Sequence, residues 1–123
     1  MKFTGMPIKG KGRGKTLGYP TINLHNLTWI DIHEGVYAAK VTIRGRVYKA
    51  AMHCGNAPTF KETEKKVELF LLDTPSITVL ETEKVTVETY SYLRPARKFM
   101  SKEELIEQIK KDVEQTNSLV TLP

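Results

Sequence analysis

The residues best suited to chemistry lie in one run between positions 10 and 24. Glycines alternate with cations at its start, and two short polar side chains follow. Backbone amides of a glycine loop approach an anion closely, and neighbouring cations add attractive charge. This composition predicts a loop that binds the phosphates of a nucleotide. Its residues are Gly10, Lys11, Gly12, Arg13, Gly14 and Lys15.

The run is not a P-loop, although its residues 14–16 match the end of that motif. The opening glycine of a P-loop would have to occupy position 9, which is Lys9. A P-loop also leads directly into a helix, whereas Gly18 and Pro20 follow here. We therefore expect the glycine loop to lead into a strand.

Thr21 and Asn23 are the candidate metal ligands. Two residues apart in a strand, they project from the same face. A hydroxyl and an amide oxygen suit Mg²⁺, which takes its other ligands from phosphates and water. A basic surface turn before an ordinary strand explains these residues equally well, because short glycine motifs give many false matches.

The elements that must position these residues are mostly strands. Residues 36–43 alternate with one apolar face, and Arg44–Arg46 form a tight connection to a strand over 47–52. Two further strands are predicted over 67–72 and 85–92. Short strands in succession predict an all-β fold, a small antiparallel Greek-key-like barrel formed by one domain over residues 1–123.

One helix is predicted after Ser101 and is expected to pack on the barrel. Ser101 and Glu104 have the spacing of a capping box, and Met100 is spaced for a hydrophobic staple onto Leu105. We expect the chain to fray after residue 116. The apolar stripe of the helix consists of Leu105, Ile109 and Val113.

Composition narrows the class of protein. Cys54 is the single cysteine, so an internal disulfide is excluded and a cytoplasmic location is expected. No stretch resembles a signal peptide or a membrane span. The net charge of +5 suits an anionic ligand, and a basic barrel that binds single-stranded nucleic acid would share it. A site for single-stranded nucleic acid needs aromatic residues along a cationic groove, and only Tyr19 accompanies the basic N-terminal run. We therefore expect neither nucleic acid nor a membrane as a partner. We also expect the protein to be a monomer.

The run from the glycine loop to Asn23 resembles the signature of the riboflavin kinase (flavokinase) family. That signature is a glycine-rich flap followed by Leu-Gly-aromatic-Pro-Thr-x-Asn. Further landmarks of the family follow in order, so that the resemblance covers about residues 5–115. These landmarks are Gly35-Val36-Tyr37, Pro58-Thr59-Phe60, Val67-Glu68 with Asp73, Leu93-Arg94 and Lys98-Phe99.

The resemblance implies an enzyme that transfers the γ-phosphate of ATP to the 5′-hydroxyl of riboflavin, giving FMN and ADP, with Mg²⁺ as cofactor. Glu68 is the only charged residue of its strand, and by itself such a glutamate is more often solvent-facing. The family's general base falls at this position, which reverses that interpretation. The implied roles are nucleotide binding by residues 10–15 and Thr21, metal binding by Thr21 and Asn23, catalysis by Glu68, and flavin binding by Arg94 and Phe99.

Two segments depart from the family pattern. Residues 73–83 lack its Leu-Tyr-Gly or Phe-Tyr-Gly element, and Met52-His53-Cys54-Gly55 replaces the more usual Asn-Ile-Gly. A catalytically idle flavin- or nucleotide-binding protein therefore stays open as an alternative. The adenylyltransferase motif His-x-Gly-His is missing from this sequence, so we expect the product to be FMN and not FAD.

Overall fold

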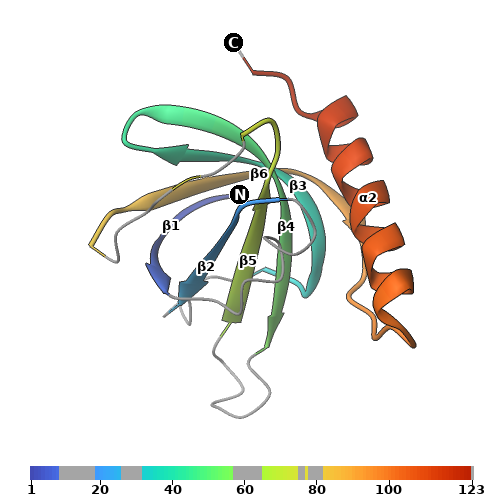
Figure 1. Cartoon of the computed structure of the whole chain (residues 1–123). Coiled ribbons are helices and arrows are strands. Elements are labelled where there is room, and N and C mark those ends of the chain that lie inside the picture. The colour runs from blue at the N-terminus through green and yellow to red at the C-terminus, as the bar shows by residue number, and fades with distance from the viewer. Residues whose placement is uncertain (9–18, 26–31, 57–64, 75–76, 78–81, 123) are drawn as a thin grey trace.

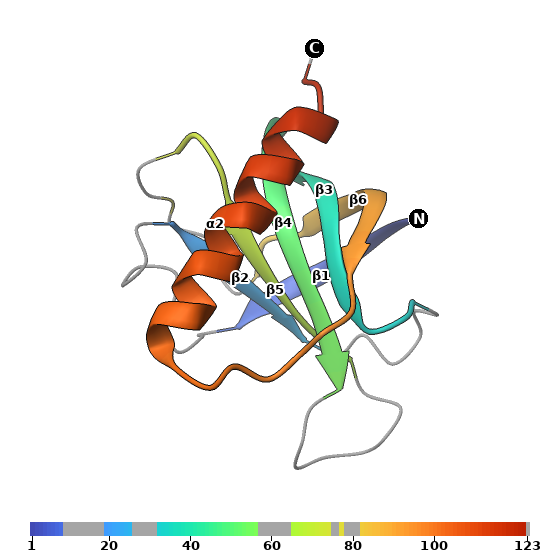
Figure 2. The same ribbon diagram turned by 90° about the vertical axis from the view of Figure 1, so that its right-hand side faces the viewer.

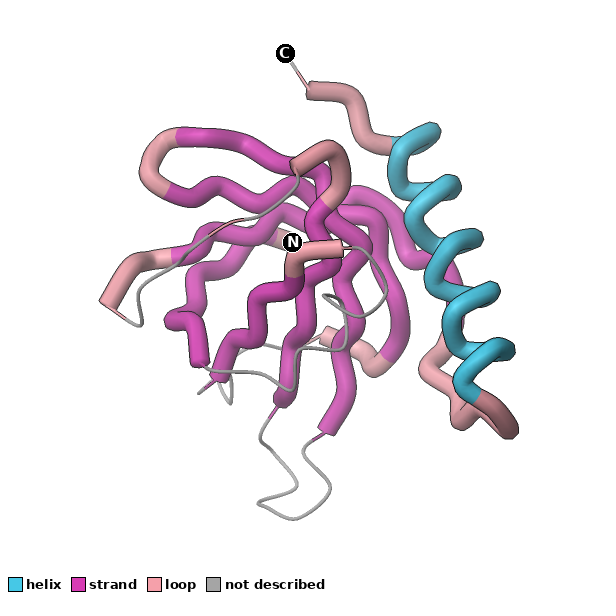
Figure 3. The backbone as a smooth tube through the Cα atoms, viewed as in Figure 1, coloured by secondary structure: helices cyan, strands magenta, loops and turns pink. Residues whose placement is uncertain are grey.

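A computed structural model describes residues 1–8, 19–25, 32–56, 65–74, 77 and 82–122. In this part of the chain, six strands close into a barrel and one helix lies against its outside (Figures 1 and 3). The predicted all-β barrel with a C-terminal helix is therefore confirmed. The elements are β1 (Lys2–Ile8), β2 (Thr21–His25), β3 (Gly35–Ile43), β4 (Arg46–Asn56), β5 (Lys65–Leu71), β6 (Val85–Arg94) and α2 (Lys102–Leu119).

The strands follow the order β1-β2-β5-β4-β3-β6 around the barrel, and every neighbouring pair is antiparallel. Closure gives each of the six described strands a paired neighbour on both sides. The predicted strands are confirmed to within a few residues. The described residues contain no helix that is both long and apolar enough to cross a membrane.

Alternating side chains of each strand fill the barrel interior. The apolar face predicted for the third strand is confirmed, because Tyr37, Ala39, Val41 and Ile43 are all buried there. The opposite face of the same strands lies on the outside, where α2 covers part of it. The other strand residues of the inner cluster are Phe3, Ile22, Leu24, Ala50, Met52, Cys54, Val67, Leu69, Leu71, Val85 and Val87.

Two backbone features shape the barrel. The predicted hairpin turn between β3 and β4 is confirmed, with Arg44 and Gly45 at φ values of 51° and 77°, as in type I′ turns. At the start of β3, a Cβ on Gly35 would lie 2.5 Å from the Tyr92 ring and 2.8 Å from the carbonyl oxygen of Arg94. Only glycine allows β3 and β6 to approach this closely at that end.

The helix α2 packs across the outer face of the sheet, as the second view shows (Figure 2). The Oγ of Ser101 accepts a hydrogen bond of 3.1 Å from the backbone N–H of Glu104, which confirms the predicted N-cap. The predicted stripe is also confirmed. Its residues Leu105, Ile109 and Val113 belong to one apolar cluster with Ala51, Phe70 and Tyr19.

Two predictions at the helix ends are wrong. Met100 is 94% exposed and makes no hydrophobic staple, since the segment before the helix directs it to solvent. The helix continues to Leu119 instead of fraying after residue 116. Val120 is buried behind it, and Lys49 of β4 donates hydrogen bonds to Asn117, so contacts with the barrel hold this last turn.

Candidate active site

The predicted site residues Asn23, Glu68 and Arg94 lie in one row on the outer face of the barrel. Asn23 on β2 is directly opposite Glu68 on β5, and Glu68 is directly opposite His53 on β4. The row continues through Val36 on β3 to Arg94 on β6. Directly opposed residues of antiparallel strands share a face and have neighbouring Cβ atoms. The register therefore brings together residues that are far apart in the sequence.

Asn23 and Glu68 are polar residues that are almost fully buried, with exposed fractions of 4% and 5%. Thr21, opposite Phe70, shares their face and is half-buried. The three side chains offer a hydroxyl, an amide oxygen and a carboxylate on adjacent positions. Such hard oxygen donors fit Mg²⁺, so the donor set agrees with the metal ion that the resemblance implies.

A pocket of about 190 Å³ opens beside Glu68 and is bordered by Phe99 and Arg94. A second hollow of about 720 Å³ lies between the start of α2 and Phe70. His53, Arg97 and Phe99 line both. The segment that connects β6 to α2 thus forms a common wall, and Glu68 faces a space that a small ligand can enter.

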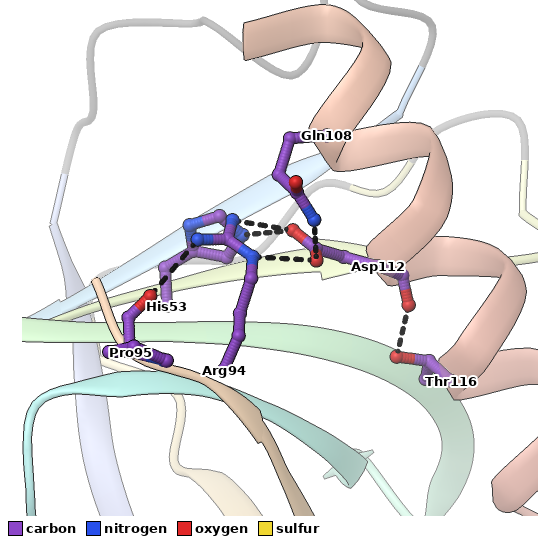
Figure 4. Close-up of polar contacts among 6 residues, drawn as sticks. All are labelled: His53, Arg94, Pro95, Gln108, Asp112 and Thr116. Carbon is purple, nitrogen blue, oxygen red and sulfur yellow. Dashed lines mark hydrogen bonds and ion pairs between the residues drawn. The ribbon is translucent and has the colours of Figure 1, made fainter. Parts of the chain in front are cut away.

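Arg94 is held by Asp112 of α2 through two hydrogen bonds. Its Nε donates to Oδ1 at 2.9 Å and one terminal nitrogen donates to Oδ2 at 2.8 Å (Figure 4). Its other terminal nitrogen donates to the carbonyl oxygen of Pro95 at 3.2 Å. Asp112 is fully buried and also accepts a hydrogen bond from Gln108. This paired arrangement joins the end of β6 to the helix.

The charge of Asp112 is stabilised by its neighbours. Burial alone would raise the pKa of its carboxyl group. The Arg94 guanidinium, the His53 ring and the Gln108 amide outweigh burial and lower the pKa of Asp112 to about 2. Asp112 is therefore a carboxylate at neutral pH.

His53 is the site residue that sequence reasoning missed. Its ring packs edge-on against Phe70, with centroids 4.7 Å apart, and its Nε2 lies 3.6 Å from Oδ2 of Asp112. Histidines were considered in the sequence only as metal ligands, and the three have no metal-ligand spacing. That spacing cannot show which residue lies opposite Glu68 on the neighbouring strand. Its place opposite Glu68 depends on strand register, which the sequence pattern does not specify.

The ring of Phe99 lies close to two arginines. The guanidinium carbons of Arg94 and Arg97 are 5.8 Å and 4.6 Å from the centroid of its ring. The flavin-binding roles of Arg94 and Phe99 stay predictions, as does the catalytic role of Glu68. The predicted nucleotide loop at residues 10–15 lies outside the described residues.

Comparisons with known proteins agree with the resemblance. A family model described as flavokinase (riboflavin kinase) matches residues 1–120. Human riboflavin kinase is 34% identical over 126 residues, which cover 97% of this chain and 80% of that protein. The bifunctional riboflavin kinase/FMN adenylyltransferase of Bacillus subtilis (strain 168) is 37% identical over 112 residues, which cover 88% of this chain and 35% of that protein.

The fold is also that of a solved structure. A crystal structure described as a macrolide-efflux protein from Streptococcus pneumoniae has a TM-score of 0.77 and 30% identity, covering 97% of this chain and 39% of that chain. The chain spans about a third of the length of the Bacillus subtilis relative. Since the family model covers nearly all of the sequence, the chain belongs to the riboflavin kinase (flavokinase) family.

Proposed function

We propose that this chain is an ATP-dependent riboflavin kinase. It transfers the γ-phosphate of ATP to the 5′-hydroxyl of riboflavin and releases FMN and ADP. The observation that carries the proposal is the buried pair of Asn23 and Glu68 beside the 190 Å³ pocket. This pair supports the proposal because a carboxylate suited to accept a proton lies opposite an amide oxygen suited to a metal ion, and the carboxylate borders the pocket.

In the proposed reaction, the hydroxyl oxygen forms a bond to the γ-phosphorus while the bond from that phosphorus to the ADP oxygen breaks. Glu68 accepts the hydroxyl proton on its carboxylate. When bound, Mg²⁺ supplies charge that neutralises the phosphate oxygens. Thr21 and Asn23 are the residues that would hold it. The glycine loop at residues 10–15 covers the phosphates.

The acceptor side of the site uses the segment between β6 and α2. Phe99 presents an aromatic ring to both hollows and suits a flat apolar ligand such as a flavin. Arg94 borders the same pocket, but two of its nitrogens donate hydrogen bonds to Asp112. We therefore propose that Arg94 contributes to flavin binding mainly by fixing the position of this segment.

The activity is tested by incubating the protein with riboflavin, ATP and Mg²⁺ and separating the flavins by chromatography. We expect FMN from the unaltered chain. Glu68→Gln keeps the shape of the side chain but removes the proton acceptor, so turnover should fall at least about a hundredfold. Glu88→Gln on β6 is the matched control and should leave turnover unchanged. Absence of FMN with retained riboflavin binding would instead indicate a catalytically idle binding protein.

The metal assignment has its own test. Asn23→Ala removes one oxygen ligand, so the affinity for Mg·ADP measured by calorimetry should fall, while the affinity for ADP in the presence of a chelator stays unchanged. Asn117→Ala, at an exposed position of α2 where Lys49 is the hydrogen-bond partner, controls for loss of an asparagine away from the site. Equal Mg·ADP affinity in Asn23→Ala and the unaltered chain would remove Asn23 from the metal site.

A further inference from the structure

His53 occupies a central position in the site, although the proposed reaction gives it no task. It lies between Glu68 and Val36 in the row across the sheet and lines both hollows. Its side chain is 21% exposed, so most of the ring is enclosed by protein. A polar ring held in this place beside the proposed base needs a physical explanation.

The Nε2 atom of His53 is buried and has no hydrogen-bond partner among the described residues. Its distance of 3.6 Å from Oδ2 of Asp112 is too long for an N–H···O hydrogen bond, which spans about 2.7–3.2 Å. An approach of about 0.5 Å would complete the bond. Such an unmade bond at a ligand site points to a contact that tightens when the site is filled.

Asp112 has capacity for this bond. Its Oδ2 accepts from Arg94, and a carboxylate oxygen accepts a second donor with its other lone pair. Arg94 and Gln108 already fix the carboxylate, and Phe70 supports the His53 ring from the side. The acceptor is therefore rigid, and a small movement of α2 or of the ring suffices to close the distance.

We propose that His53 is a positioning residue for Glu68, and this inference rests on the proposed kinase function. In the ligand-filled site, the Nε2–H of His53 donates to Oδ2 of Asp112. The ring is then fixed against Glu68 on the side away from Asn23. Glu68 is held between Asn23 and His53, so its carboxylate keeps one orientation toward the acceptor hydroxyl. Through this contact, Asp112 of α2 influences the orientation of the proposed base Glu68.

Steady-state kinetics test the positioning role. His53→Leu keeps the bulk of the side chain but removes the donor, and we expect kcat to fall about a hundredfold, as for a base misplaced by about 1 Å. The KM for ATP should stay within about twofold, because the proposed metal ligands Thr21 and Asn23 are on β2, on the other side of Glu68 from His53. His53→Gln, whose amide N–H can reach Asp112, should recover most of kcat. Equal losses in both variants, or an unchanged kcat in His53→Leu, would overturn the proposal.

A double-mutant cycle separates positioning from independent chemistry. If His53 acts through Glu68, adding His53→Leu to Glu68→Gln should cause no further loss of turnover. A further hundredfold loss in that background would mean that His53 acts on its own and would contradict the proposal. Thermal unfolding of each variant, measured in parallel, shows whether any loss follows from unfolding.

A spectroscopic measurement tests the hydrogen bond without relying on turnover. In ¹⁵N-histidine-labelled protein, the signal of the His53 ring is assigned as the one missing from His53→Gln. Addition of riboflavin and Mg·ADP should produce an exchange-protected Nε2–H. An unprotonated or rapidly exchanging Nε2 in this complex would refute the inference. Failure of the unaltered chain to make FMN would refute the proposed function. The NMR measurement tests only the hydrogen bond between His53 and Asp112, so the two failures can be distinguished.

Discussion

At the scale of single residues, Asp112 forms a buried ion pair with Arg94. Its carboxylate is fully buried, and the side chain of its partner Arg94 is only 14% exposed. Moving two charges from water into the protein costs free energy, which offsets much of their attraction. The free energy of unfolding therefore depends on the pair mainly because removing one partner would leave the other buried without a counter-charge. The two hydrogen bonds between them satisfy both groups and tie β6 to α2.

Asp112→Asn should therefore lower the free energy of unfolding by about 3 kcal/mol, because Arg94 is left buried without a counter-charge. Urea unfolding at neutral pH measures this loss. Glu104→Gln is the matched control on the same helix, since it breaks the exposed pair of Glu104 with Arg97. That pair should be worth at most about 1 kcal/mol. Similar losses in the two variants would contradict the assignment of Asp112 as a buried anchor.

The sequence identified some site residues and not others for a physical reason. Asn23 and Glu68 stand out because each occupies a position of the family's motifs, Asn23 in Thr-x-Asn and Glu68 in Val-Glu. Asp112 and His53 do not. Asp112 occurs among other charges on an amphipathic helix, where a solvated face is the ordinary interpretation. Its burial results from Arg94, a partner 18 residues away, and no local pattern encodes that contact.

At the scale of elements, α2 is held on the barrel by a small apolar contact. Ile109 is 2% exposed and packs with Phe70 and Ala51 of the sheet. This contact also positions Asp112, which lies one turn further along the helix. Packing of the helix and geometry of the site are therefore coupled.

Ile109→Ala should lower the free energy of unfolding by about 2–5 kcal/mol, because it leaves a cavity between helix and sheet. Lys110→Ala, at the neighbouring exposed position, should change it by less than about 0.5 kcal/mol. Denaturant unfolding followed by circular dichroism compares the two. A loss in Ile109→Ala no larger than in Lys110→Ala would show that the helix is not held by this contact.

The strands were predictable where apolar residues alternate clearly, as over 36–43 and 85–92. The first strand, β1, was not predicted. Its buried positions are Phe3, Gly5 and Pro7, and glycine and proline are residues that normally argue against a strand. Pairing with β6 and β2 on its two sides overrides that local preference.

For the whole molecule, closure of the barrel explains why the site lies outside it. The interior is filled by side chains, so ligands can bind only on the outer face or at the ends. The helix covers one part of that face, and the polar row beside it stays accessible through the pocket at Glu68. The order of strands around the barrel, which joins β2 to β5, is what creates the row. Sequence patterns predicted five of the six described strands but not this order.

The whole molecule should also respond to acid through Asp112. Its pKa is lowered from 3.8 to about 2 in the folded state, so folding favours the charged form. The resulting stabilisation, about 2 kcal/mol, is complete above the unfolded pKa and is lost as the pH falls from about 4 through about 2.

Other acidic groups and the net charge of +5 also weaken the fold in acid, but they act equally in Asp112→Asn. The difference in unfolding free energy between the two proteins should therefore shrink by about 2 kcal/mol between about pH 6 and pH 2. A difference that stays constant with pH would show that the ionisation of Asp112 is not coupled to folding.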